Sequence, residues 1–386
     1  MSSSERNSWL LPEGIEDVLP DRAAQLEQVR RRLLDHFSGW GYEYVITPML
    51  EFLDSLLTGT GRDLDIKTFK VTDQMSGRTM GVRADMTPQA ARIDAHSLNR
   101  DGPVRLCYAG TVLHSRPDNM LASRSPTMAG AELFGVRDAS ADLEIVCLMV
   151  DALQALGVDR IHLELGDVSI FRELVTGVSE ADQAEIFDLI QRKAHADLAA
   201  AVERSVADPV LRELIIELPR LCGGSEVLFR AQEMFAGNDT ICASIRNLEW
   251  ISERVADRFS GIDFYYDLSE LRGYSYHTGI VFAAFVDGTR VAKGGRYDDV
   301  GAVFGRNRGA TGFDVHVASL ASLLRALVPE HSQVLVRATD TINDDCWRAV
   351  QALRSEGVTV IETLDDSAAG AARLSFVDGE WQVVQQ

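Results

Sequence analysis

The stretch 105-RLCYAGTVLHSRPDNMLASRSPTMAGAELFG-135 decides how the chain folds. It predicts a strand over 105–114, a loop rich in Pro, Asn and Ser, and a second strand that ends at Gly135. Strands joined through a polar loop are a common frame for a nucleotide site on an antiparallel sheet. The charged side chains that such a site needs are mostly absent from this stretch. The reason for their absence has to be sought in the rest of the sequence.

Composition narrows the classes of protein and partner. Of the 386 residues, 46% are hydrophobic and 25% are charged, which is typical of a soluble globular protein. The net charge of −20 weighs against a large nucleic-acid footprint, because phosphate neutralisation needs a basic surface. It also opposes binding of ATP unless the pocket supplies its own cations.

Targeting and metal signals are missing from the sequence. No run of eighteen apolar residues predicts a membrane span, and the first residues lack the features of a secretion signal. The five cysteines are scattered and odd in number, which disfavours a disulfide framework and fits the cytoplasm. The eight histidines have no metal-binding spacing, so we expect neither a metal nor a cofactor.

Hydrophobic periodicity predicts two domains. Residues 1–330 combine helices and hairpin strands in an α+β domain, with a mostly helical insertion at about 169–259. Residues 331–386 predict a small α/β domain close to the lower size limit for independent folding. Within the large domain, the apolar spacing of 20–39 and 140–156 is typical of amphipathic helices.

Short turn signals predict several hairpins. Asp287-Gly288 and Asp378-Gly379 each separate two apolar runs, which is a strong hairpin signal. A further hairpin is expected around Ser76-Gly77. Residues 41–51 predict a single strand, and Pro48 within it suits a sheet edge or an interface.

Two groups of polar residues are suited to binding an amino acid. Arg83, Asp85 and Thr87 follow a strand; the acidic and hydroxyl groups would accept from an α-ammonium, while an arginine suits a carboxylate. The segment 271–279 places a cation, two tyrosines and an imidazole where a strand begins. Taken singly, each group is more typical of a structural ion pair or a polar core edge.

A third constellation, 293–298, has two glycines that would let the backbone approach a ligand closely. Alone it is more typical of a tight turn. All three constellations in one chain, together with 105–135, favour a binding site over three unrelated structural features.

These stretches together resemble the catalytic core of class II aminoacyl-tRNA synthetases, and specifically of histidyl-tRNA synthetase, over about 12–327. Residues 41–51 resemble the dimer-forming motif 1, 105–135 align with motif 2, and 310–320 lie where motif 3 is expected. Arg272-Gly273-x-x-Tyr276 resembles the histidine-specific R-G-L-D-Y-Y element, and 294–298 match G-G-R-Y-D. The resemblance implies a class II synthetase-like antiparallel sheet flanked by helices.

The chain departs from the synthetases where they bind ATP. His114 stands where an arginine holds the α-phosphate, and Arg116 where a glutamate contacts adenine. Ala122 replaces a loop arginine, Pro126 the phenylalanine that stacks on adenine, and Ser319 the arginine on the γ-phosphate. Because loss of one preorganised donor costs ~3 kcal/mol of transition-state stabilisation, we expect no adenylation.

The resemblance implies that the amino-acid side of the pocket persists in weakened form, since Met128 replaces a glutamine that helps to hold the amino acid. An α-ammonium would meet Asp85 and Thr87, an imidazole Glu132, and a carboxylate Arg272. The candidates for histidine binding are Asp85, Thr87, Glu132, Arg272, Tyr276 and His277.

This combination is similar to the regulatory subunits of ATP phosphoribosyltransferase, a family of synthetase-like chains without aminoacylation. The similarity implies a non-catalytic subunit that activates a short-form ATP phosphoribosyltransferase and mediates histidine feedback in the first step of histidine biosynthesis. Its expected partners are that catalytic subunit, a second copy of the chain and L-histidine, with no tRNA and no membrane. The alternative is an active histidyl-tRNA synthetase, or a related amino-acid ligase, with a truncated C-terminal domain.

Overall fold

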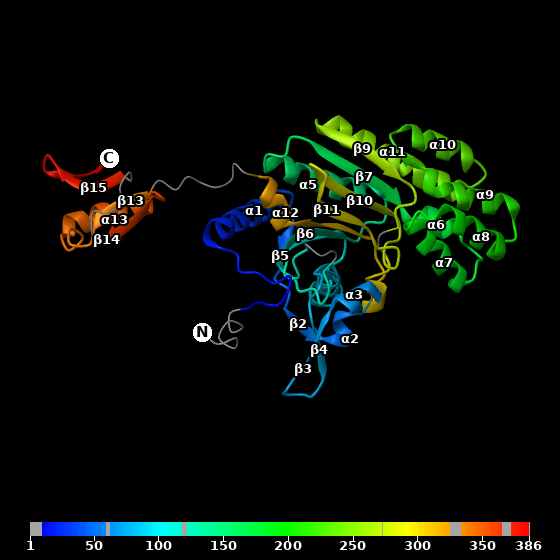
Figure 1. The fold of residues 1–386 in the computed structure, drawn as a ribbon, viewed down its shortest axis with the longest axis horizontal. Coiled ribbons are helices and arrows are strands. Elements are labelled where there is room, and N and C mark those ends of the chain that lie inside the picture. Colours follow the sequence, from blue (N-terminus) through cyan, green and yellow to red (C-terminus); the bar gives the residue numbers. More distant parts are fainter. Residues whose placement is uncertain are drawn as a thin grey trace. The chain divides into compact units, whose positions relative to one another are not determined.

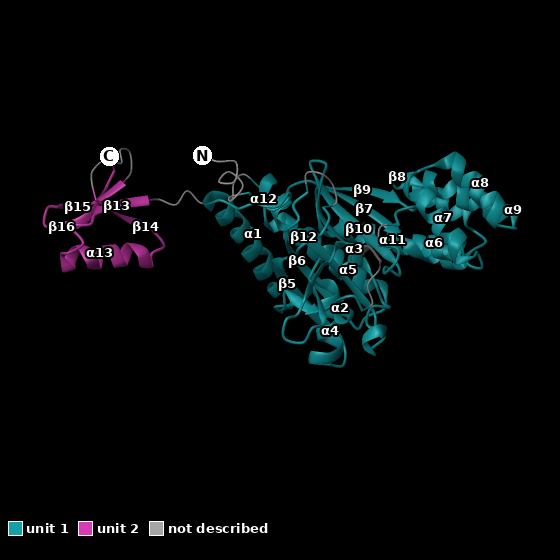
Figure 2. Cartoon of the chain, turned by 60° about the horizontal axis from the view of Figure 1, so that its bottom comes forward, with its two compact units in different colours: residues 1–327 teal, residues 328–386 magenta. Residues whose placement is uncertain are grey.

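The computed structural model describes residues 10–58, 62–117, 122–271, 273–324, 333–364 and 372–385. The chain divides into two compact units, residues 1–327 and 328–386, drawn in teal and magenta in Figure 2. Each unit has its own buried apolar core. The two are therefore described separately.

A nine-stranded sheet forms the centre of the large unit (Figure 1). Neighbouring strands run antiparallel from β5 through to β7, whereas the β1–β5 and β7–β9 pairs are parallel. The predicted α+β fold with an antiparallel sheet flanked by helices is confirmed. In spatial order the strands are β1 (Glu43–Tyr44), β5 (Val104–Thr111), β6 (Thr127–Phe134), β12 (Ala310–His316), β11 (Thr289–Arg296), β10 (Ile280–Val286), β7 (Ile161–Asp167), β9 (Ile262–Asp267) and β8 (Cys222–Gly223).

Helices cover one face of this sheet. Side chains alternate along β6, so that Ala129, Ala131 and Leu133 join the main apolar core. Gly130 and Glu132 consequently face the other way. The helices that pack against the sheet on the apolar side are α1 (Pro20–Gly39), α5 (Ala139–Ala155), α11 (Asp239–Arg258) and α12 (Val317–Leu323).

A smaller layer lies over the opposite face. It contains α4 (Thr87–Arg92), which packs against β6 and continues into the π-helix Ile93–Leu98. It also holds a three-stranded antiparallel sheet of β2 (Leu50–Phe52), β4 (Thr79–Val82) and β3 (Phe69–Thr72), which confirms the hairpin around Ser76-Gly77. The short helices α2 (Leu53–Leu56), α3 (Arg62–Lys67) and η3 (Ala302–Phe304) complete the non-insertion part of the unit.

The prediction of one strand over 41–51 is wrong. The segment forms the two short strands β1 and β2, which belong to different sheets. Between them the chain is held by Arg83, whose Nη1 donates to the carbonyl oxygen (2.7 Å) and hydroxyl (2.9 Å) of Thr47. Pro48 follows directly and has no backbone N–H to give to a ladder.

The region 168–258 consists of helices joined by short turns and loops, and its one strand is the two-residue β8. Its helices gather at the end of the sheet that carries β7 and β9, in green in Figure 1. They are α6 (Val168–Leu174), α7 (Glu180–Gln191), α8 (His195–Ser205), α9 (Pro209–Glu217) with the 3₁₀ turn Leu218–Arg220, α10 (Glu226–Met234) and α11.

The small unit has a four-stranded sheet in the order β14 (Thr359–Thr363), β13 (Gln333–Arg337), β15 (Ala372–Val377) and β16 (Glu380–Val384), with α13 (Asp344–Ser355) packed on it. Both Asp-Gly hairpins are confirmed, because Asp287 and Asp378 have φ of 48° and 52° and each glycine after them also has positive φ. Within the described ranges, no helix is long and apolar enough to cross a membrane.

Candidate functional site

A cavity of about 280 Å³ opens on the face of the large sheet that carries Glu132. It is lined by five of the six predicted histidine-binding residues: Asp85, Thr87, Glu132, Tyr276 and His277. Arg272 lies outside the described residues, although its neighbour Gly273 lines the cavity. Segments nearly two hundred residues apart in the sequence thus meet around one space.

Strand register explains why polar groups line this face. Residues directly opposite one another on neighbouring strands point to the same side of a sheet. One such row contributes a phenol, two carboxylates and an ammonium, separated by residues with little or no side chain. In spatial order it is Tyr108, Gly130, Asp314, Lys293, Ala283 and Glu164.

The carboxylate of Glu132 is held by three hydroxyl groups. Its Oε1 accepts from the hydroxyls of Thr87 (2.8 Å) and Tyr108 (2.7 Å), and its Oε2 accepts from the hydroxyl of Tyr297. The side chain is only 1% exposed. Burial raises the pKa of Glu132, the three hydroxyl donors offset part of that rise, and the resulting pKa is about 8.

Two glycines make room for the polar groups above them. Gly312 lies directly opposite Glu132, and a Cβ at this position would lie 1.6 Å from Oε2. Gly295 is the cross-strand partner of Gly312 on the other side, and a Cβ there would lie 2.7 Å from Cε1 of His277. Gly295 and Gly312 are directly opposed and therefore about 5 Å apart. The side chains of His277 and Glu132, one above each glycine, consequently lie close together.

The segment 273–279 closes one side of the cavity. The ring of Tyr276 stacks on that of His277 with centroids 4.2 Å apart. From α6, Nη2 of Arg172 donates to the carbonyl oxygen of His277 at 2.9 Å. Burial lowers the pKa of His277 to about 3 and raises that of Tyr276 to about 12, so both rings are neutral at pH 7.

Asp85 is organised by its own backbone. Its Oδ1 accepts from the backbone N–H groups of Met86 (2.6 Å) and Thr87 (3.1 Å) at the start of α4. By contrast, Arg83 does not take part in the cavity, contrary to its suggested role toward a carboxylate. Its guanidinium donates instead to the carbonyl oxygens of Thr47 and Thr111.

Several lining residues had no role assigned from the sequence. Nζ of Lys293 lies 3.7 Å from Oδ2 of Asp314, and this carboxylate raises the pKa of the lysine. Burial raises the pKa of Asp314 to about 6. Strand alternation is the sequence signal that could have identified Asp314. It stands two residues after Gly312, so its side chain points to the same face of the sheet as that position. Other charged lining residues without an assigned role are Lys67, Glu164, Glu270 and Arg290.

A larger groove of about 1040 Å³ continues from the cavity, with which it shares Lys67, Asp85, Arg290, Lys293 and Asp314. Four positions at which the resemblance implies loss of ATP contacts line this groove: His114, Ala122, Pro126 and Ser319. Arg116 is exposed and is not among the residues that line the groove.

The side chains at these positions are engaged locally. Nε2 of His114 lies 3.0 Å from the carbonyl oxygen of Ala84. The hydroxyl of Ser319 lies 3.0 Å from Nδ1 of His316, which caps α12. Arg124, in the stretch 105–135, donates to the carbonyl oxygens of His114 (3.0 Å) and Glu13 (3.2 Å).

The metal-ligating types do not cluster. Among the residues that the structure describes, no group of three or more His, Cys, Asp or Glu side chains could hold a metal ion. The cavity lining itself consists largely of hydrogen-bonding and charged groups, which suit a small polar molecule.

Known proteins share this architecture. Residues 14–320 match the family described as histidyl-tRNA synthetase. A Cellvibrio japonicus protein named ATP phosphoribosyltransferase regulatory subunit is 45% identical over 384 residues, which cover 97% of this chain and 96% of that protein. A Pseudomonas fluorescens protein of the same name is 48% identical over 388 residues, covering 97% and 98%.

Solved structures agree in fold. One from Bacillus halodurans, described as an ATP phosphoribosyltransferase regulatory subunit/histidyl-tRNA synthetase, has a TM-score of 0.81 at 24% identity and covers 94% of both chains. The histidyl-tRNA synthetase of Nostoc has a TM-score of 0.75 at 18% identity, covering 94% of this chain and 88% of that one.

Proposed function

Because the chain belongs to the family of ATP phosphoribosyltransferase regulatory subunits, built on a histidyl-tRNA synthetase domain, we propose that it activates a short-form ATP phosphoribosyltransferase and transmits feedback inhibition by histidine. Its place is then in histidine biosynthesis, as a non-catalytic subunit.

The observation that carries this proposal is the contrast between the two neighbouring spaces. The cavity retains a buried carboxylate, hydroxyl donors and two neutral rings suited to an amino acid. At the replaced positions of the groove, His114 and Ser319 offer a phosphate no permanent cation, and Nε and Nη1 of Arg124 donate to backbone carbonyls. The cations that line the groove, Arg22, Lys67, Arg290 and Lys293, stand at other positions than the replaced ones. Amino-acid activation depends on cations preorganised around the phosphates, so adenylation is not supported.

Histidine fits the cavity by charge and by hydrogen-bonding type. Asp85 and the hydroxyl of Thr87 would accept from the α-ammonium. The ionised form of Glu132 would accept from an imidazole N–H through Oε2, which has one donor among its described contacts, so binding would release the proton that this carboxyl holds at neutral pH. Arg272 would take the carboxylate, and Tyr276 and His277 would close over the ring.

We also propose a homodimer through residues 41–51, the segment that resembles motif 1. Exposed fractions in the single chain are 47% for Tyr44, 80% for Ile46, 42% for Met49 and 44% for Leu50, which is unusual for neighbouring apolar side chains. An Ile46→Glu variant should sediment as a monomer. The matched control is Val210→Glu, which changes another strongly exposed apolar side chain (66%), on α9, and should leave the dimer intact. Equal sedimentation of the two variants would contradict this interface.

Histidine feedback is tested by titrating histidine against the activity of the assembled complex. Glu132→Ala should abolish inhibition at concentrations that inhibit the wild-type complex. Glu144→Ala is the control, because Glu144 is a partly buried carboxylate that binds Arg105 and Tyr42 and does not line the cavity. Unchanged inhibition in Glu132→Ala would show that histidine acts elsewhere, for instance on the catalytic subunit.

A further inference from the structure

The ring of His277 is held by the backbone of β11. Its Nδ1 lies 3.2 Å from the carbonyl oxygen of Arg296. A carbonyl oxygen can only accept, so Nδ1 carries the ring proton in this hydrogen bond and Nε2 is left with its lone pair. His277 lines the cavity, and the described hydrogen bonds of its ring involve Nδ1 alone.

The same carbonyl oxygen holds the backbone of the segment. It accepts from the N–H of Thr278 at 2.7 Å. A displacement of the Arg296 carbonyl would therefore move the ring of His277 and the end of the segment that carries Tyr276 together.

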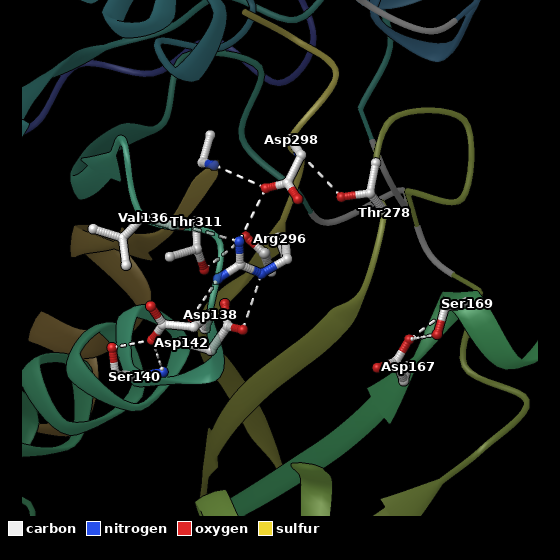
Figure 3. Close-up of polar contacts among 12 residues, drawn as sticks. Val136, Asp138, Ser140, Asp142, Asp167, Ser169, Thr278, Arg296, Asp298 and Thr311 are labelled. Atoms are coloured by element: carbon white, nitrogen blue, oxygen red, sulfur yellow. Dashed lines mark hydrogen bonds and ion pairs between the residues drawn. The ribbon is translucent and has the colours of Figure 1, made fainter. Parts of the chain in front are cut away.

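The side chain of Arg296 anchors that carbonyl from the other side (Figure 3). Its Nε donates to Oδ2 of Asp142 and its Nη1 to Oδ1 of Asp298, both at 3.0 Å. Its Nη1 and Nη2 also donate to the backbone oxygens of Val136 (3.2 Å) and Asp138 (3.1 Å), just before and at the start of α5. The Arg296 and Asp142 side chains are each only 8% exposed.

Asp298 extends the same network to two more segments, as Figure 3 shows. Its backbone N–H donates to the hydroxyl of Thr278 at 3.0 Å, and its Oδ1 accepts from the N–H of Ala310 at 2.9 Å. The network thus joins α5, the end of β11, the start of β12 and the 273–279 segment. None of its side chains is a predicted ligand contact.

We propose that Arg296 is a positioning residue of the cavity, held by Asp142 and Asp298, whose carbonyl fixes His277 as the Nδ1–H tautomer and so makes its Nε2 an acceptor. The cavity consequently selects ligands that present an N–H to His277. The identity of the ligand as histidine rests on the proposed function, whereas the tautomer and its anchor do not.

The direct readout is the ¹⁵N spectrum of the histidine side chains in the full chain, because ring nitrogens with and without a proton have well-separated shifts. A His277→Gln variant assigns the signal. In the wild type we expect one Nδ1–H tautomer for His277. In Asp142→Asn, which removes the charge but keeps the shape of the side chain, and in Arg296→Lys, we expect a mixture of both tautomers.

Binding is measured on the same proteins by calorimetry. Loss of a positioned acceptor should weaken the affinity for histidine by roughly tenfold or more in Asp142→Asn. Arg308→Lys is the matched control, since Arg308 forms a similarly buried ion pair with Asp94 (3.3 Å) that does not contact the 273–279 segment. This control should keep both the His277 tautomer and the affinity of the wild type.

An Nε2–H tautomer in the wild type, or an unchanged tautomer and affinity in both Asp142→Asn and Arg296→Lys, would overturn the proposal. Equal loss of affinity in Arg308→Lys would also overturn it, because the effect would then be one of general stability. If the wild type bound no histidine but showed the expected tautomers, the effector role in the proposed function would fail and the positioning role would stand.

Discussion

Replacing Glu132 with Gln should stabilise the unliganded protein at pH 8 and weaken its binding of histidine. The amide oxygen of Gln can accept from Thr87 and Tyr108 as the carboxylate does, and its NH₂ can donate to the oxygen of Tyr297. The variant therefore resembles the protonated form of Glu132. It cannot accept a ligand N–H at the position of Oε2.

The magnitude follows from the pKa of Glu132. Burial raises it from 4.5 to about 8 in the folded protein. Between these values the folded protein retains a proton that the unfolded chain has released, so the free energy of unfolding falls as the pH rises. At 1.36 kcal/mol per pH unit, the wild type should lose roughly 4 kcal/mol from this group between pH 5 and pH 8, and the variant should not.

The assay is urea unfolding of both proteins at pH 5 and pH 8 without ligand, with the result expressed as the difference between them. Buried carboxyls common to both proteins, such as Asp167, cancel in this difference. Glu144→Gln is the control: burial opposes ionisation of Glu144, but hydrogen bonds from Arg105 and Tyr42 outweigh it and lower the pKa. Its difference from the wild type should be constant over this range. A constant difference for Glu132→Gln as well would refute the reasoning.

Three further results are expected. Gly312→Ala should abolish histidine binding in calorimetry, because its Cβ would lie 1.6 Å from Oε2 of Glu132; wild-type affinity would contradict this packing. The chain should catalyse no histidine-dependent ATP–pyrophosphate exchange, because His114 and Ser319 offer no permanent cation, and exchange above background would support an active synthetase. A chain cut to residues 1–327 should keep the melting temperature of the large unit in the full chain, since each unit has its own core; its unfolding would show that the units depend on each other.

Local sequence signals predicted the helices and hairpins that are determined by residues close together in the sequence. The hairpin at Asp287-Gly288 follows from residues that tolerate positive φ, and α1 from Pro20 at its first position and apolar residues at helical spacing. The break in 41–51 could not be predicted in the same way. It depends on Arg83, which follows β4 and reaches Thr47 from more than thirty residues later in the sequence.

The candidate site also contains residues that could be predicted from the sequence and residues that could not. Glu132 was identified through the resemblance, and the structure brings it together with the other described candidates. The hydroxyls of Tyr108 and Tyr297 were not identified from the sequence, because their contact with Glu132 depends on strand register across three segments of the chain. The role of Arg296 was equally hidden, since it acts through its carbonyl and through Asp142, 154 residues away.

The central claim is tested most directly by the rate at which a purified short-form ATP phosphoribosyltransferase forms phosphoribosyl-ATP with and without this chain. The account predicts that the rate rises when the chain is added, and that histidine lowers the rate of the complex through the cavity around Glu132. A rate that is the same with and without the chain would contradict it.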